Sequence, residues 1–215
     1  MNIVVFIFDR LTALDAIGPY EVLARLPDAQ LTFAGLERGI VRTDNGRLGL
    51  EVDARIDEID SCDVLVVPGG FGTRALERNE KVLAWIRRTD EQTRVTASVC
   101  TGALLLGAAG LLNRRRANTH FAVRHRLSEF GAVPVSERVV ADGKYRTAAG
   151  VSAGIDLALA LAVELAGREH AEAIQLALEY APEPPINAGR EDLAPPAIAD
   201  RVRERVRRRD EEARS

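Results

Sequence analysis

Short apolar runs alternate along the chain with segments that have helical periodicity. The runs are rich in valine, isoleucine and phenylalanine, and they lie at Ile3–Phe8, Leu31–Ala34, Val64–Val67 and Val95–Val99. Apolar runs of this length are typical of strands that are buried on both faces. Because such strands alternate with helices, the pattern predicts an α/β fold in which helices cover both faces of a mostly parallel sheet.

Three segments carry the residue spacing of helices that pack on such a sheet: Ala13–Leu26, Glu80–Arg88 and Ser152–Ala166. The first contains Gly18-Pro19, which we expect to break its first turn because proline removes a helical hydrogen bond. The third is almost wholly apolar. We expect it to be buried on most of its circumference, between the sheet and another layer or subunit.

Two further segments have the pattern of antiparallel ribbons. In Gly39–Val52 the turn signal Asn45-Gly46 is flanked by strand-like residues, and Val133–Gly150 carries a second signal at Asp142-Gly143. Both residue pairs suit the tight turns of β-hairpins. We therefore predict a hairpin in each segment.

The composition of the chain changes after Tyr180, where a proline-rich stretch is expected to run extended across the surface. Beyond it, Ala197–Arg209 has the apolar spacing of an amphipathic helix, which suits docking or dimerisation. We accordingly divide the chain into an α/β domain, residues 1–190, and a C-terminal amphipathic helix with a charged tail, residues 191–215.

Composition and charge narrow the classes of partner. A formal net charge of −3 provides no general attraction to nucleic acid or to anionic membranes. Arg201–Arg209 holds six arginines, but acidic residues follow at once and no aromatic residues interleave them, which disfavours nucleic-acid binding. The N-terminal apolar run is too short to cross a bilayer, so no membrane partner is expected.

The two cysteines, Cys62 and Cys100, lie far apart in a chain without an export signal. This arrangement argues against a disulfide and favours reduced thiols in the cytoplasm. Cys62 lies beside Asp63 ahead of a core strand, and we expect it to be buried and inert.

Cys100 stands where a strand-like run gives way to a helix, in the stretch ASVCTGALLLGAAGLL. A side chain at such a turn projects above the carboxyl edge of the sheet, and small neighbours such as Thr101 permit a close approach. The amides at the start of the helix are expected to lower the pKa of the thiol. The residues alone leave two interpretations open: a packed, inert cysteine and a nucleophile.

Two other motifs supply possible partners for Cys100. In VVPGGFG, the Gly69-Gly70 pair lets backbone N–H groups point into a site, and the N–H groups of Gly70 and Thr101 could form an oxyanion hole. Such a loop can equally be a plain turn. In LDAIGPYEVL, Asp15 opens the first helix at the same edge of the sheet, where it could be an N-cap or a proton shuttle. A carboxylate and a thiolate in contact would repel, so the pair is expected to share a proton.

Of the three histidines, only His120 is a candidate for the site. His120, in NTHF, either borders the site or is a structural residue, while His125 and His170 are expected to be exposed. No cluster of histidine, cysteine and carboxylate residues has the spacing of metal ligands, so we expect no metal.

Taken together, DAIGPYEVL, VVPGGFG, SVCTGALLLGAAGLL, NTHF, GVSAGIDLAL and LEYAPEPPINAG resemble the ThiJ/PfpI superfamily, and most closely its isonitrile hydratase branch. The resemblance extends from residue 2 to about residue 190. It implies a flavodoxin-like three-layer sandwich, as in class I glutamine amidotransferases, and a homodimer. It also implies a hydratase that needs no cofactor and converts a small isonitrile to an N-substituted formamide.

Carried over by position, the resemblance makes Cys100 the nucleophile, Asp15 the acid and base, and Thr101 a neighbour that assists through its amide and hydroxyl, while Gly70 supplies the second amide donor. The protease-like branch has a histidine directly after the cysteine, so Thr101 disfavours peptidase chemistry. Hydratases commonly have an aromatic residue and a tryptophan where this chain has Ile186 and Phe121, which affects the shape of the substrate pocket.

A ligand sensor or thiol-redox sensor is the alternative function. The ligand domain of AraC-type transcriptional regulators has a similar cysteine turn, followed by a DNA-binding module. Only about 25 residues follow Gly189 here, too few for two helix-turn-helix units. A stand-alone sensor is still compatible with the sequence, since an activated cysteine is readily oxidised.

Overall fold

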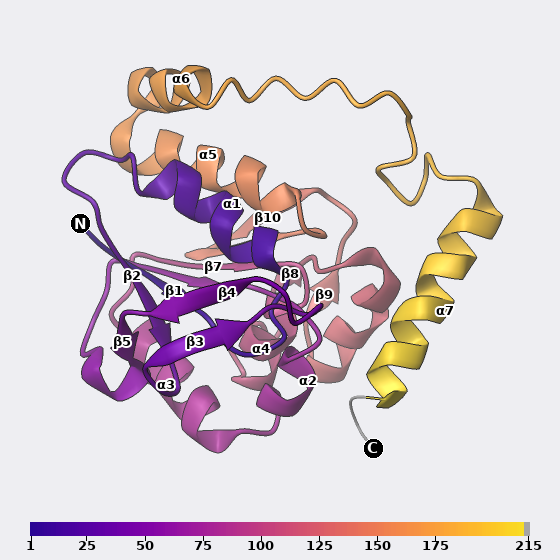
Figure 1. The fold of residues 1–215 in the computed structure, drawn as a ribbon, viewed down its shortest axis with the longest axis horizontal. Coiled ribbons are helices and arrows are strands. Elements are labelled where there is room, and N and C mark those ends of the chain that lie inside the picture. Colours follow the sequence, from indigo (N-terminus) through magenta and orange to yellow (C-terminus); the bar gives the residue numbers. More distant parts are fainter. Residues whose placement is uncertain (213–215) are drawn as a thin grey trace.

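A seven-stranded sheet forms the middle layer of the protein in the computed structural model, which describes residues 1–212 (Figure 1). In spatial order its strands are β10 (Val139–Asp142), β11 (Tyr145–Ala148), β7 (Val95–Val99), β6 (Val64–Val67), β1 (Asn2–Phe6), β2 (Gln30–Gly35) and β5 (Ala54–Arg55). Neighbouring strands are parallel everywhere except in the β10–β11 pair. The mostly parallel sheet predicted from the apolar runs is confirmed.

The central strands β1, β6 and β7 are the most deeply buried part of the sheet. Every residue of β6 and β7 is buried, and so is every residue of β1 except Asn2. Burial on both faces explains the continuous apolar runs of β1 and β6, whereas β7 also buries two small polar residues, Thr96 and Ser98. Since the strands are parallel, their carboxyl ends meet at one edge, which is where such sheets gather their functional groups.

Helices cover both faces of the sheet, as predicted. They are α1 (Ala13–Leu23), α2 (Thr73–Leu76), α3 (Glu80–Asp90), α4 (Gly102–Ala108), α5 (Ala153–Ala166), α6 (Arg168–Ala177) and α7 (Pro196–Glu212), with two 3₁₀ helices, η1 (Ile56–Glu58) and η2 (Phe121–Phe130). Helices α1 and α5 pack together on one face, while α2, α3 and α4 lie on the other (Figure 1). Within one chain α5 is buried along the side toward the sheet and exposes Ala160, Val163 and Glu164.

Helix α1 continues through Gly18-Pro19, so the expected break in its first turn was wrong. Proline inside a helix removes one backbone donor but leaves the other hydrogen bonds in place. The helix also packs closely on α5, because a Cβ added at Gly18 would lie 3.1 Å from the Ile155 side chain. This tertiary packing outweighs the local cost of the proline.

Both predicted hairpins are present, one of them with a shifted turn. Strands β3 (Gly39–Arg42) and β4 (Gly49–Val52) form an antiparallel ribbon outside the main sheet. In the second hairpin Asp142 pairs with Tyr145, so the two turn residues lie one position later than expected. The beginning of that segment forms β9 (Val133–Pro134), which pairs in parallel with β8 (Arg116–Ala117) and had no signal in the sequence.

The C-terminal part of the chain leaves the body and returns to it. Residues 181–190 are extended and exposed, and they lead to α7, which contacts η2 (Figure 1). The last residues of the predicted charged tail, 213–215, lie outside the described part. None of the helices within residues 1–212 is long and apolar enough to cross a membrane.

Helix α4, which follows the cysteine turn, offers a test of the packing. Leu105 is fully buried in α4, and its replacement by alanine leaves a cavity and is expected to lower the free energy of unfolding by about 2–5 kcal/mol. Leu176 on α6 is 78% exposed, and Leu176→Ala is expected to change the free energy of unfolding by less than about 0.5 kcal/mol. Urea denaturation measures both values. Equal effects of the two substitutions would contradict this packing.

Candidate active site

Cys100 stands on a strained turn between the end of β7 and the start of α4. Its φ of 55° lies in the left-handed region, which is costly for a residue other than glycine. The surrounding structure holds this conformation: the Cys100 N–H donates to the carbonyl of Ala149 at 3.0 Å, and the Cys100 carbonyl accepts from the Thr119 hydroxyl at 2.6 Å. Gly102 follows directly, and any Cβ there would collide with the carbonyl oxygen of Val67. The predicted strand–cysteine–helix arrangement is therefore present.

Asp15 lies in the first turn of α1 and is completely buried. Thr12 occupies the N-cap position, so the interpretation of Asp15 as the N-cap was wrong. Asp15 Oδ2 accepts from the N–H of Gly69 at 2.9 Å, whereas Oδ1 has no conventional hydrogen-bond partner among the described residues. The Cys100 thiol is close enough to interact with the carboxyl, and each group shifts the pKa of the other.

Burial controls the protonation of this pair. It raises the pKa of Asp15 from 3.8 to about 7, although hydrogen bonds from Gly69 and Cys100 act in the opposite direction. Burial, together with the charge of Asp15, also raises the pKa of Cys100 well above its ordinary value. The N–H groups of Thr101 and Val151 lower that pKa but do not compensate. The expectation of a lowered thiol pKa was wrong, because loss of solvent outweighs the amides of a short helix.

The glycine loop touches both the carboxyl and the cysteine turn. A Cβ at Gly69 would lie 2.5 Å from the backbone nitrogen of Thr101 and 2.9 Å from Asp15 Oδ2, so only glycine fits. The N–H of Gly70 donates to Thr101 Oγ1 at 2.8 Å. The two amides expected to form an oxyanion hole are thus engaged within the protein, that of Gly70 with the Thr101 hydroxyl and that of Thr101 with the Cys100 sulfur.

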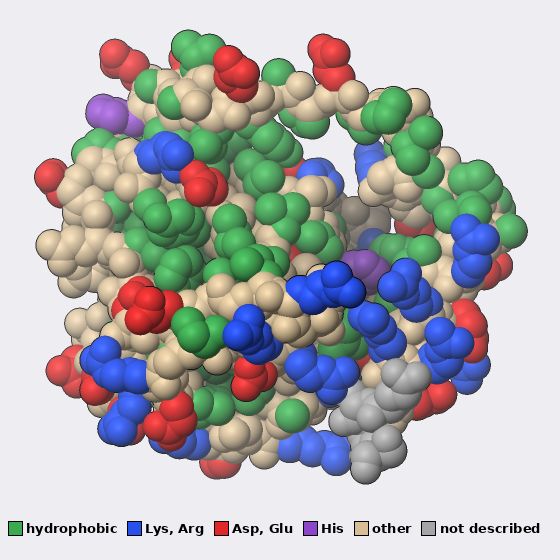
Figure 2. All heavy atoms as spheres, viewed as in Figure 1, with side chains coloured by type: hydrophobic (Ala, Val, Ile, Leu, Met, Phe, Trp, Pro, Cys, Tyr) green, Lys and Arg blue, Asp and Glu red, His purple; other side chains and the backbone are tan. Residues whose placement is uncertain are grey.

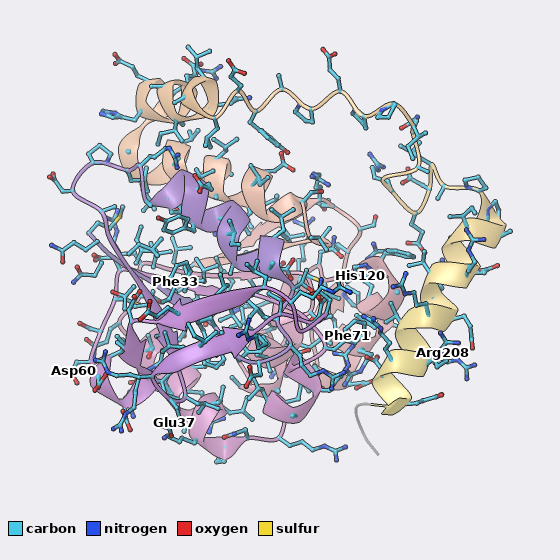
Figure 3. The ribbon with its side chains drawn as sticks, in the orientation of Figure 1. Phe33, Glu37, Asp60, Phe71, His120 and Arg208 are labelled. Atoms are coloured by element: carbon cyan, nitrogen blue, oxygen red, sulfur yellow. The ribbon has the colours of Figure 1, made fainter. Side chains whose placement is uncertain are left out.

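His120 lies close to the site but bonds within its own segment. Its Nδ1 accepts from the Ala122 N–H at 3.4 Å at the start of η2, and its ring packs on Phe121. A Cβ at Gly150 would lie 2.6 Å from the ring, so His120 lies beside Gly150, which directly precedes Val151. Burial and nearby Arg124 and Arg74 lower its pKa. Figure 3 shows His120 on the side of the body that faces α7.

The other residues expected from the sequence take no part in the cysteine–carboxyl contact. Cys62 is buried, and burial raises its pKa to about 12. His125, His170 and Ile186 are exposed. Within residues 1–212 no group of histidine, cysteine and carboxylate side chains could hold a metal ion.

Three residues of the site were not singled out from the sequence, although Thr119 lies in NTHF and Val151 in GVSAGIDLAL. The N–H of Val151, at a φ of 38°, acts on the Cys100 sulfur, Thr119 holds the Cys100 carbonyl, and Thr73 Oγ1 lies 3.3 Å from Thr101 Oγ1. Each comes from a loop or helix start whose position depends on packing between distant segments. No local pattern shows that these three residues reach the Cys100 turn.

Access to the sulfur is narrow, since Cys100 is only 5% exposed. The structure has a cavity of about 480 Å³ between β3 and α2 and another of about 800 Å³ between η2 and α7. Neither Cys100 nor Asp15 lines these two cavities.

Comparison of the sequence with known proteins finds relatives in one family. The sequence profile of the DJ-1/PfpI family matches residues 1–164. The chain is 45% identical over 200 residues to isonitrile hydratase of Pseudomonas putida, covering 93% of this chain and 87% of that protein. It is 28% identical over 133 residues to deglycase PfpI of Pyrococcus furiosus, covering 61% and 79% respectively.

Solved structures of other proteins superpose on this fold over most or nearly all of the chain. The ThiJ/PfpI family protein of Pseudomonas syringae superposes with a TM-score of 0.94 at 34% identity, covering 99% of this chain and 88% of that one. DJ-1beta of Drosophila melanogaster superposes with a TM-score of 0.74 at 24% identity, covering 84% and 98%. The flavodoxin-like three-layer fold is confirmed.

The raised thiol pKa can be tested directly. Asp15→Asn removes a negative charge beside the sulfur, so it is expected to lower the pKa of Cys100. The rate of alkylation by iodoacetamide across a pH series, in a Cys62→Ala background, measures this pKa. An unchanged or higher pKa in the variant would show that Asp15 does not act on the thiol.

Proposed function

The chain belongs to the DJ-1/PfpI family, and we propose that it is a hydratase that adds water to an isonitrile and releases an N-substituted formamide. The observation that carries the proposal is the pairing of buried Cys100 with the buried carboxyl of Asp15, whose pKa is raised to about 7. The similarity to isonitrile hydratase over nearly the whole chain supports it. Thr101, in place of a histidine after the cysteine, accords with chemistry other than peptide hydrolysis.

The first half of the reaction uses the single proton of the pair. Asp15, as the carboxylate, takes the proton of the Cys100 thiol, and the thiolate attacks the terminal carbon of the isonitrile. A carbon–sulfur bond forms, the electron pair is left on that carbon, and Asp15 returns the proton to it. The product is a thioimidate, and Asp15 is again a carboxylate. A carboxyl with a pKa near neutrality suits both proton transfers.

The second half consumes water. Asp15 takes a proton from a water molecule while the oxygen of that water attacks the thioimidate carbon, and Asp15 then passes this proton to the substrate nitrogen. The carbon–sulfur bond of the resulting adduct breaks, the adduct hydroxyl loses its proton to become the formamide carbonyl, and Cys100 regains its proton. The N–H groups of Thr101 and Val151, which already act on the sulfur, would stabilise the thiolate in both halves.

The same burial disfavours the redox-sensor alternative. Thiolate is the form of cysteine that peroxides oxidise, and a pKa well above the ordinary value leaves little thiolate at neutral pH. In the hydratase the thiolate forms only when the substrate is in place and Asp15 accepts the proton. We therefore favour the enzyme.

Dimerisation and location form part of the same proposal. Hydrophobic side chains gather over α1 and α5 on the face shown in Figure 2. Leu14 of α1 is 39% exposed and Val163 of α5 is 48% exposed. A second copy would cover this face in a homodimer. The free thiols Cys62 and Cys100 suit the reducing cytoplasm.

Turnover of isonitriles tests the proposed reaction. We expect release of N-substituted formamide from a panel of alkyl isonitriles, none with Cys100→Ala, and a loss of about 10²-fold or more with Asp15→Asn. Below pH about 7, kcat/KM should fall about tenfold per pH unit as Asp15 becomes protonated and can no longer accept the thiol proton. Cys62→Ala serves as the control. Absence of Cys100-dependent turnover across the panel would refute the proposal.

The dimer has a separate test. Val163→Glu places a charge on the exposed stripe of α5 and should convert a dimer to a monomer, as measured by light scattering after gel filtration. Leu193→Glu, on the exposed connection, should leave the mass unchanged. A monomeric wild-type protein would rule out this assembly.

A further inference from the structure

The C-terminal helix reaches the cysteine turn through buried side chains. Asp210 of α7 and Arg74 of α2 form a bidentate pair, with both N–O distances 2.9 Å. The Arg74 side chain is 4% exposed and that of Asp210 13%. These two residues are 136 positions apart in the chain, and residue 210 lies beyond the part matched by the family profile.

From Arg74 the contacts continue to the site. Arg74 Nη1 donates to Thr73 Oγ1 at 3.3 Å, and the Thr73 hydroxyl donates to the Gly70 carbonyl at 2.8 Å. Thr73 Oγ1 also lies 3.3 Å from Thr101 Oγ1, which itself accepts from the Gly70 N–H. Because Arg74 approaches Thr73 as a donor, the single hydroxyl proton of Thr73 points away from Arg74, toward the Gly70 carbonyl and Thr101 Oγ1. A continuous set of hydrogen bonds thus leads from Arg74 to Thr101, the residue next to Cys100.

The charge of Arg74 is balanced inside the fold. Glu77 accepts from Arg74 at 3.1 Å and forms a second bidentate pair with Arg126, which Glu129 also approaches at 3.4 Å. The two guanidinium groups are thus paired with the carboxylates of Glu77, Asp210 and Glu129. Removing one member of a buried cluster leaves an uncompensated charge, which must move or gain water. Loss of Asp210 would therefore displace Arg74 in particular.

We propose that Arg74, oriented by Asp210, is a positioning residue that holds the Thr73 hydroxyl and, through it, the Gly70 loop and Thr101 beside Cys100. Helix α7 then contributes to the geometry of the site rather than only covering the surface. A second, independent attachment holds α7 in place, because Glu191 at its approach accepts from Arg124 at 3.0 Å and pairs with Arg203. Loss of the Asp210 carboxylate should consequently disturb the site without releasing the helix.

The kinetic part of the test rests on the proposed function. Asp210→Asn and Thr73→Val are each expected to lower kcat about tenfold with KM changed less than about twofold, because the substrate still binds while the reacting groups are misaligned. The double variant should be no slower than either single variant, since both act along one path. Glu204→Gln, which removes an exposed carboxylate of α7 paired with Arg207, is the matched control and should have no effect.

Two measurements do not require any substrate. Hydrogen exchange of the Gly70 amide, followed by NMR, should be about tenfold faster in Asp210→Asn and in Thr73→Val, because the bond to Thr101 Oγ1 is weakened. The rate of Cys100 alkylation should change in the same two variants and not in Glu204→Gln. If the wild type hydrates no isonitrile, the proposed reaction fails while these measurements still decide the role of Arg74.

Glu191→Gln separates positioning from attachment of the helix. It should loosen the approach to α7 and leave Gly70 exchange and Cys100 alkylation unchanged. The proposal is overturned if Glu191→Gln reproduces the effects of Asp210→Asn, or if neither Asp210→Asn nor Thr73→Val alters exchange and alkylation. Additive losses of kcat in the double variant would also overturn it.

Discussion

A carboxyl group without any exposure to solvent lies beside a thiol that is almost as deeply buried. In water the carboxyl of Asp15 would ionise freely, but burial removes its solvation and raises its pKa. The conventional hydrogen bond that it accepts comes from the backbone N–H of Gly69. The pair therefore keeps a proton near neutral pH, and neither group ionises without affecting the other. The chemistry open to the site follows from this coupling.

The surrounding structure holds Cys100 beside Asp15 despite the free-energy cost of burying both groups and of the positive φ of Cys100. Cys100 is held at a positive φ by backbone bonds from β11 and by the Thr119 hydroxyl, while Gly102 lets α4 start directly against β6. Glycine at position 69 allows the loop after β6 to pass between Asp15 and Thr101. Segments distant in sequence thus converge on the Cys100 turn and hold its strained backbone in place.

Much of the fold could be predicted because its signals are local. Central strands buried on both faces are rich in apolar residues, and the hairpins need turn residues that tolerate positive φ. The parallel pairing of β8 with β9 and the continuation of α1 through Pro19 could not be predicted, since both depend on packing against segments distant in sequence. Cys100 and Asp15 were found because each follows a strand at the same edge of the sheet.

The sequence by itself determined the order of strands and helices, the position of the cysteine turn and the residues able to react there. The tertiary structure decided their protonation, because burial is a property of the whole fold and reversed the expected shift in the pKa of Cys100. It also decided which amides are already engaged, and it joined α7 to the site through Asp210 and Arg74. Desolvation and long-range contacts are sums over distant segments, so no local pattern contains them.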